Sequence, residues 1–399
     1  MAGALDGVRI LDLTTMVSGP MACMMLADQG AEVIKVESPA GDQMRALGPA
    51  HAGMTGTFFS CNRGKKSIAL DLKTEAGRAA LRDLIASADV LVQNFRPGAI
   101  ERMGFGEQAV REIRPDILYV SISGFGETGP YAGTRVYDPI IQALTGATDV
   151  QADRKTGRPH MFQVIIADKV TALTAAQAIC AGLFARLRSG EGQHIRLSML
   201  DSLVAFFWPE QMATLNFVGE ESDPAGVRSG MDLIYETRDG YITVAAVSDG
   251  EWKALCAVLE RTDWITDPRF KDAAARVRNV EARKTAVAAE LAGWSTEAVL
   301  EKLRDADVPC APLLSRQALI DDPQVNANAL LVIEDYERLG AVRQPRPVAQ
   351  FDATPSKITG PAPFHGEHSR AILEALGYEA GRIDALEAEG VLIAAGDAP

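Results

Sequence analysis

The chain has 399 residues, 47% of them hydrophobic and 23% charged, which is the composition of a soluble globular protein with room for two or three domains. Its net charge of −13 argues against nucleic acid or an anionic membrane as a partner, although small anionic ligands stay possible through local Arg and Lys. The five cysteines are widely spaced without a C-x-x-C pair, which disfavours disulfides and zinc and favours a reducing cytoplasm. We find no targeting signal and no apolar run of the roughly 18 residues that a membrane span needs.

The first third of the chain alternates short β-branched runs with longer amphipathic stretches. Strands are expected at 8–13, 32–37, 67–72, 89–95 and 116–122, and helices at 19–29, 74–88 and 98–113. Strands that alternate with helices of this length indicate βαβ crossovers and a mostly parallel sheet. Residues 137–218 are expected to be mainly helical, with helices at 139–146 and at 168–190, the second ending at Gly190 and Gly192.

A second, smaller unit is expected after the polar stretch 219–230. Its first segment contains Asp239-Gly240 between two alternating runs, which predicts a β-hairpin over 233–247. Helices near 250–260 and 279–306 follow; Pro and Gly in 339–363 then indicate a linker, and a final helix at 367–378 is expected to return to the first unit. We therefore predict an α/β fold. It has a large domain over 1–218, completed by 340–399, and a smaller α+β domain over 225–335.

Residues 123–130, SGFGETGP, spell G-x-G-x-x-G after an apolar run and raise the question of a dinucleotide site. Such a loop must lead straight into a helix whose N-terminus meets the pyrophosphate. Here it leads into the turn residues 130–133, and the first βα turn contains only Gly19. Glu37 lies where a ribose-binding acid is found, but an acid at a strand end is commonly a solvated cap. We interpret 123–130 as an active-site or structural turn.

Among the other polar residues, carboxylates in apolar settings are the strongest candidates for chemistry. The histidines are scattered, and H-E-x-x-H, G-x-S-x-G and Walker motifs are absent, so metal, serine-hydrolase and P-loop chemistry have no support. Asp168 follows the apolar run 164–167 and starts an Ala-rich helix, so burial would raise its pKa while the helix N-terminus would lower it. Such a carboxylate can act as a base or nucleophile, and an N-cap role is the alternative. Asp138, after Tyr137, raises the same two alternatives.

Five segments carry a resemblance to a known family: 7–45, 62–74 (NRGKKSIALDLKT), 94–106 (NFRPGAIERMGFG), 118–146 and 168–200. In this order and spacing the chain resembles the class III CoA transferases of the formyl-CoA and carnitine type, which are related to the α-methylacyl-CoA racemases. The C-terminal half resembles them only loosely, through the hairpin and 252–256 (WKALC). The resemblance implies a Rossmann-like large domain, a small domain and an interlocked homodimer. It also implies CoA and acyl-CoA as substrates, without a metal or a tightly bound cofactor.

The resemblance also implies roles for individual residues. Asp168 matches the nucleophile, which forms a mixed anhydride with the acyl group and then an aspartyl-CoA thioester, from which CoA passes to the acceptor acid. Contacts with CoA are implied for Met16, Val17, Ser18, Leu72, Lys73, Asn94, Phe95, Arg102 and Arg135, and Tyr137 is a candidate for the substrate pocket. Arg102 and Arg135 are expected to pair with the CoA phosphates, with solvated surface charges as the alternative. Lys65 and Lys66 are expected near the phosphates as well.

Departures from the family's pattern bear on the substrate. Val17 stands where formyl-CoA transferases have Gln, which disfavours oxalate and formyl-CoA. The loop 225–232 is poorer in Gly than the loop that covers their aspartyl intermediates, and Ala172 replaces a Gly common in the family. Tyr137 stands where the racemases have His, and a racemase needs two acid/base groups. CoA transfer to a carboxylic acid is therefore the leading hypothesis. A racemase or epimerase and a non-catalytic CoA-binding protein are the alternatives, and the donor and acceptor acids stay open.

Overall fold

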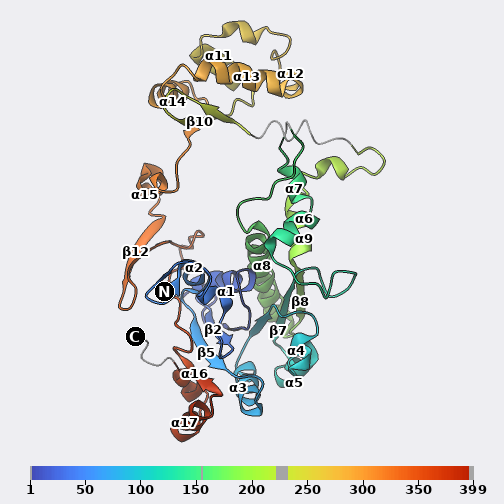
Figure 1. Ribbon diagram of the computed structural model, residues 1–399, viewed down its shortest axis with the longest axis vertical. Coiled ribbons are helices and arrows are strands. Elements are labelled where there is room, and N and C mark those ends of the chain that lie inside the picture. Colours follow the sequence, from blue (N-terminus) through green and yellow to red (C-terminus); the bar gives the residue numbers. More distant parts are fainter. Residues whose placement is uncertain (1, 154–155, 222–231, 395–399) are drawn as a thin grey trace. The chain divides into compact units, whose positions relative to one another are not determined.

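The computed structural model describes residues 2–153, 156–221 and 232–394, so the predicted Gly-poor loop 225–232 lies outside the described residues except for Asp232. The chain divides into two compact units: Met1–Phe206 with Ala329–Pro399, and Phe207–Asn328 (Figure 1). The predicted domains, 1–218 with 340–399 and 225–335, place each junction somewhat later in the chain than these units do. As functional domains they stay a prediction.

A seven-stranded sheet forms the centre of the first unit. Its strands are β1 (Arg9–Asp12), β2 (Glu32–Glu37), β5 (Lys66–Leu70), β6 (Val90–Gln93), β7 (Leu118–Ser123), β8 (His194–Ser198) and β14 (Leu392–Ile393). Neighbouring strands pair in parallel, except that β14 pairs antiparallel with β5. The predicted α/β class with a mostly parallel sheet is confirmed.

Helices cover both faces of this sheet, which explains why its strands are nearly continuous apolar runs (Figure 1). On one face lie α1 (Ser18–Asp28) and α8 (Ile166–Ser189). On the other lie α3 (Glu75–Ala86), α5 (Glu107–Ile113), α16 (Ser369–Ala375) and α17 (Ala380–Ala388). The predicted return of the C-terminal helix to the first unit is confirmed, because α16 packs against β5.

The order of the strands defines where a ligand can bind. The sheet reads β14-β5-β2-β1-β6-β7-β8, so the chain builds outward from β1 in one direction and, from β6 onward, in the other. This is the strand order of a Rossmann fold, in which the turns after the two central strands diverge and leave a crevice for ligands. Here these turns are residues 13–17 after β1 and 94–98 after β6.

Helix α8 corrects one expectation. By length and composition Ile166–Ser189 is apolar enough to cross a membrane, contrary to the expectation that no run reaches this length. Its Ala172, Ala175 and Ile179 are fully buried in the core that α8 shares with α1 and the sheet. Small Ala side chains allow the two helices to pack closely, so the core of this unit accounts for part of the apolar composition of α8.

Two segments of the first unit differ from their predicted structure. Strand β8 interrupts the stretch 137–218 that was expected to be mainly helical, and β12 (Leu331–Tyr336) with β13 (Gly340–Pro345) forms a hairpin partly inside the expected linker. Neither segment has the apolar pattern by which strands were predicted, because β8 is an edge strand and the hairpin is largely exposed. The remaining elements are β3 (Ala50–His51), β4 (Met54–Thr55), η1 (Gln43–Arg45), α2 (Gly56–Asn62), α4 (Ala99–Arg102), α6 (Asp138–Leu144), α7 (Ala147–Val150) and α9 (Met199–Phe207).

The second unit contains an antiparallel sheet in the order β11-β10-β9. Its elements are η2 (Ala213–Leu215), β9 (Ile234–Glu236), β10 (Tyr241–Val244), α11 (Asp249–Val258), η3 (Thr262–Ile265), α12 (Ala273–Arg278), α13 (Val280–Leu291), α14 (Thr296–Asp305), β11 (Cys310–Pro312), η4 (Ala318–Asp321) and α15 (Pro323–Ala327). The hairpin predicted around Asp239-Gly240 is confirmed. The packed rings of Trp252, Trp264 and Phe270 lie in the core of the second unit.

Candidate functional site

A cleft of about 360 Å³ opens where the turns after β1 and β6 diverge. The segments that contribute to its walls are 15–18, 94–97, the end of β7 with Gly124 (122–124) and 132–137. Asp168, near the start of α8, lies in this cleft. The ends of parallel strands and the starts of helices therefore meet at one point, as in ligand sites of open α/β sheets.

Asp168 faces the N-terminus of a second helix. The N-cap of α8 is Ile165, so the N-cap alternative for Asp168 is wrong. Instead, its Oδ1 accepts a hydrogen bond from the backbone N–H of Ser18, at 3.2 Å. Ser18 is the first residue of α1, where N–H groups have no partner within the helix. The starts of α1 and α8 thus both favour a negative charge on this carboxylate.

Asp138, the first residue of α6, supports Asp168 from below the cleft. Its buried side chain accepts the backbone N–H of Asp168 at Oδ2, at 3.1 Å, and the Gln142 amide at Oδ1, at 2.6 Å. Gln142 in turn accepts the backbone N–H of Phe162, on the approach to α8. The N-cap of α6 is Tyr137, so the N-cap alternative is wrong for Asp138 too. Asp138 and Gln142 together fix where α8 begins.

Burial and the neighbouring negative charge of Asp138 raise the pKa of Asp168 to about 6, while hydrogen bonding from Ser18 acts in the opposite direction. The carboxylate is therefore mostly ionised at neutral pH, although it is partly buried. A partly buried anion that keeps its charge but lacks full solvation is suited to act as a nucleophile or base.

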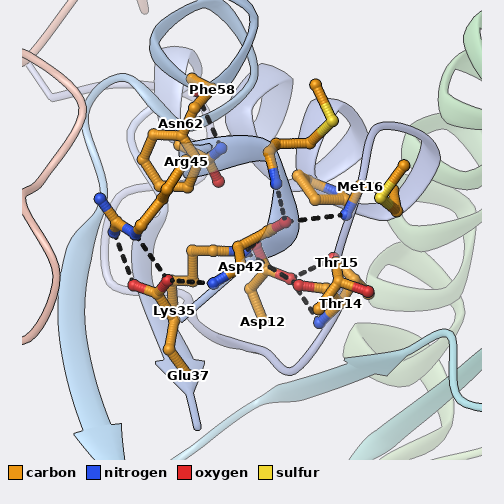
Figure 2. Close-up of polar contacts among 12 residues, drawn as sticks. Asp12, Thr14, Thr15, Met16, Lys35, Glu37, Asp42, Arg45, Phe58 and Asn62 are labelled. Carbon is orange, nitrogen blue, oxygen red and sulfur yellow. Dashed lines mark hydrogen bonds and ion pairs between the residues drawn. The ribbon is translucent and has the colours of Figure 1, made fainter. Parts of the chain in front are cut away.

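The turn after β1 has an unusual backbone. Met16 has a φ of 69°, in the left-handed region that residues with side chains rarely adopt. From the β6 side, Asn94 accepts the Thr15 N–H at 3.0 Å and donates to the Thr15 carbonyl at 2.8 Å. Below the turn lies a cluster of charged side chains that includes Asp12 and Lys35 (Figure 2). The turn that carries Ser18 is thus held by contacts from several strands.

Gly19, the second residue of α1, lies directly against Thr14. A Cβ at Gly19 would lie 2.4 Å from Thr14 Cβ, and Thr14 is tied by its hydroxyl to Asp12. We expect Gly19→Ala to lower the free energy of unfolding by about 1–3 kcal/mol, measured by urea unfolding, and to weaken CoA binding in calorimetry. Gly381→Ala is the control, because a Cβ at this second residue of α17 would meet nothing within 4 Å. Equal losses in both variants would contradict the steric explanation.

The structure brings most of the predicted site residues to the cleft. Those that line it are Met16, Ser18, Asn94, Phe95, Arg135, Tyr137 and Asp168. Val17 is buried behind the turn, and Arg102 lies on α4 with its guanidinium beside Gly98. Leu72 and Lys73 follow β5, which β2 separates from β1. The CoA contacts of Val17, Arg102, Leu72 and Lys73 stay predictions.

Two lysines and one acid lie outside the cleft, each in an ion pair. The Lys65 amine is buried 2.7 Å from Asp12 Oδ2, at the end of β1, and Lys66, at the start of β5, pairs with Glu32. Neither lysine lines the cleft, and their expected place near the phosphates stays a prediction. Glu37 is buried and binds Arg45 at 2.7 Å, so it is no solvated cap.

Several residues that line the cleft were not predicted, among them Thr15, Gln43 and Arg96. Arg96 directly follows the predicted site residues Asn94 and Phe95, in a turn with Pro and Gly. This position in the sequence could have indicated that Arg96 lines the cleft. A larger cavity of about 820 Å³ adjoins the cleft and shares Phe95, Arg96 and Ser123 with it. We assign the chemistry to the smaller cleft because Asp168 lies there.

The loop 123–130 is a turn, as interpreted from the sequence. The next helix, α6, begins only at Asp138, and the Ser123 hydroxyl accepts the Gly126 N–H at 2.9 Å. A Cβ at Gly124 would lie 2.3 Å from Val136 Cγ1. Gly124 thus lets the loop lie against the segment that carries Arg135 and Tyr137, and the G-x-G-x-x-G spacing reflects local packing.

The family model described as CoA-transferase family III matches residues 5–369. The chain belongs to CoA-transferase family III. This transferase is 35% identical to the succinyl-CoA:glutarate CoA-transferase of Mus musculus, over 97% of this chain and 90% of that protein. It is also 35% identical to the succinyl-CoA:mesaconate CoA-transferase of Haloarcula marismortui, over 95% of this chain and 98% of that protein. The crystal structure of a CaiB/BaiF family protein from Brucella suis matches with a TM-score of 0.82 and 32% identity, over 94% of this chain and 100% of that one.

The family assignment confirms the resemblance and the prediction of an enzyme. This family III member is a CoA transferase, and CoA thioesters are its substrates. An α/β fold with a mostly parallel sheet agrees with that of the Brucella suis protein.

Proposed function

We propose that this CoA transferase moves CoA from an acyl-CoA donor to a small dicarboxylic acid through covalent intermediates on Asp168. The observation that carries the proposal is the placement of the Asp168 carboxylate. It lies partly buried in the cleft at the crevice of the sheet, with a pKa of about 6 and one backbone N–H at 3.2 Å. An ionised carboxylate with few water partners is a better nucleophile than a solvated one.

The reaction proceeds in four acyl transfers. Asp168 attacks the thioester carbonyl of the donor, the C–S bond breaks, and a mixed anhydride and CoA thiolate result. The thiolate attacks the aspartyl carbonyl, which releases the donor acid as its carboxylate and leaves an aspartyl-CoA thioester. The acceptor carboxylate attacks this thioester and expels the thiolate, giving a second anhydride. The thiolate then attacks the acceptor's acyl carbon, which forms the new acyl-CoA and restores the Asp168 carboxylate.

The Ser18 N–H has a defined part in these steps. Two of the four attacks occur at the aspartyl carbon, and in each a negative charge develops on an Asp168 oxygen. A backbone N–H already within hydrogen-bond distance of Oδ1 stabilises that charge without a large rearrangement. The start of α1 adds its dipole in the same direction.

Arginines in the cleft suit anionic substrates. Arg96 and Arg135 both line it with exposed side chains, and a guanidinium gives directed hydrogen bonds to phosphates and carboxylates. Leu72 and Lys73 lie two strands along the same edge, about 10 Å away, within the reach of a molecule as long as CoA. The relatives' names mention succinyl-CoA, glutarate and mesaconate, which supports a dicarboxylate acceptor.

We also propose a homodimer, in line with the family resemblance. Helix α8 exposes large apolar side chains: Leu173 is 56% exposed, Phe184 62% and Leu187 83%. An apolar face of this kind on a helix otherwise used in the core is typical of a protein–protein contact. Sedimentation velocity is expected to give twice the mass of one chain, and Phe184→Glu/Leu187→Glu is expected to reduce it. A wild-type protein that sediments as a monomer would contradict the dimer.

The mechanism is tested by trapping. The protein is incubated with a panel of acyl-CoA donors and quenched with hydroxylamine, which converts both the anhydride and the thioester to a hydroxamate that peptide mass spectrometry locates. We expect the hydroxamate on the Asp168 peptide, dependent on one donor. Exchange of the donor's α-hydrogen with solvent, without a hydroxamate, would instead indicate a racemase. Binding of CoA without either would indicate a non-catalytic CoA-binding protein.

A further inference from the structure

An ion pair outside the cleft contacts the turn 13–17, which leads into Ser18 at the start of α1. Lys35 in β2 and Asp42 in the following loop have fully buried side chains, and Lys35 Nζ lies 3.0 Å from Asp42 Oδ2. Lys35 also donates to the Thr14 carbonyl at 2.9 Å, and Asp42 Oδ1 accepts the Met16 N–H at 3.3 Å (Figure 2). Both partners therefore hydrogen-bond to the backbone of this turn, and Asp42 Oδ1 also accepts the Met44 N–H at 3.0 Å as the N-cap of η1.

The pair belongs to a charge-balanced cluster. Asp12 with Lys65 and Glu37 with Arg45 form two further ion pairs, each at 2.7 Å. Asp12 also accepts the Thr14 N–H at 2.9 Å. Buried ion pairs are weak evidence for stability, since well-packed apolar residues often replace them without loss. What these charges provide here, and apolar residues do not, is a set of hydrogen bonds to the turn.

We propose that the Lys35–Asp42 pair positions the turn for catalysis, holding Met16 in its left-handed conformation and thereby keeping the Ser18 N–H directed at Asp168. The proposal rests on the proposed function as far as the reaction is concerned. A left-handed residue with a side chain persists only where its surroundings hold it. Met16 is two residues before Ser18, so relaxation of its backbone redirects the first N–H of α1. Neither Lys35 nor Asp42 lines the cleft, so both are positioning residues.

The double variant Lys35→Met/Asp42→Leu tests this proposal. It removes both charges at similar volume and leaves the two other ion pairs balanced. The control Lys66→Met/Glu32→Leu removes another lysine–carboxylate pair, at 2.6 Å between β5 and β2, which is partly exposed and does not touch the turn. Lys35→Met/Asp42→Asn is a milder variant, because Asn keeps an oxygen for the Met16 N–H.

Two readouts separate positioning from simple stability. Hydrogen exchange of the peptide covering 14–18, measured without substrate, is expected to be faster in the double variant than in the wild type and control. The rate of Asp168 hydroxamate formation is expected to fall on the order of 10²-fold with a smaller change in KM for the donor. The milder variant is expected to lie between, and it carries the same test if the double variant does not fold.

Unchanged exchange at 14–18 in a folded variant would overturn the proposal, and so would wild-type rates of hydroxamate formation. Failure of the proposed function gives a different pattern. In that case the wild type itself forms no hydroxamate on Asp168, whereas the exchange measurement still decides whether the pair holds the turn.

Discussion

Replacing Asp168 with Ala is expected to lower kcat for CoA transfer by at least about 10⁴-fold, because a covalent nucleophile has no substitute in the cleft. CoA binding is expected to persist, since the substitution removes a negative charge from a site for an anionic ligand. Asp168→Asn is expected to be equally inactive. Its amide oxygen can still accept the Ser18 N–H, so this variant keeps the local structure while losing the nucleophile. Steady-state kinetics and calorimetry with CoA measure the two effects separately.

A matched control is available on another helix. Asp201 also lies in the first turn of a helix, α9, but it is exposed and lines the larger neighbouring cavity. Asp201→Ala is expected to change kcat by less than about twofold, as for an exposed residue away from the reacting atoms. If Asp168→Ala kept more than about one-hundredth of kcat, covalent catalysis on this residue would be excluded, because an acyl transfer without its nucleophile cannot proceed at that rate.

Hydrophobic pattern predicted the central elements of the fold well. The run 32–37 was predicted as a strand and forms β2 at those residues, because its β-branched Val33, Ile34 and Val36 are buried in the cores on the two faces of the sheet. The same rule fails where one side is open. β8 pairs on one side only, and β13 is mostly exposed, so neither has a continuous apolar run.

The candidate site was predictable where sequence neighbours determine it. Asp168 could be found because an apolar run and an Ala-rich helix flank it, which implies burial at a helix start. Its contact with Ser18 joins residues 150 positions apart and depends on how α1 and α8 pack, which no local pattern encodes. Lys35 interrupts an apolar strand and so signals a buried charge, but its partners become visible only when the turn after β1 is folded over it.

The rate of Asp168 acylation is expected to rise with pH through about 6 and to level off above it. The sign follows from the chemistry: only the ionised carboxylate attacks the thioester. As the pH falls below the pKa of Asp168, the protonated fraction grows and the rate drops about tenfold per pH unit. Rapid quench with hydroxylamine at several pH values measures this limb directly.

Asp138→Asn is expected to move this acid limb to lower pH. The negative charge of Asp138 is one cause of the raised pKa of Asp168, and Asn removes that charge while keeping an oxygen for the Asp168 N–H. Gln142 loses its hydrogen bond to residue 138, because the Asn amide group then faces it with its NH2, but it keeps its bonds to Phe162 and Val164. The pKa of the CoA phosphate is also about 6. Because the same substrate is used with the wild type and with Asp138→Asn, a difference between their two pH–rate profiles reports on the enzyme alone. A limb that stays in place, or moves to higher pH, would show that Asp138 does not set the pKa of Asp168.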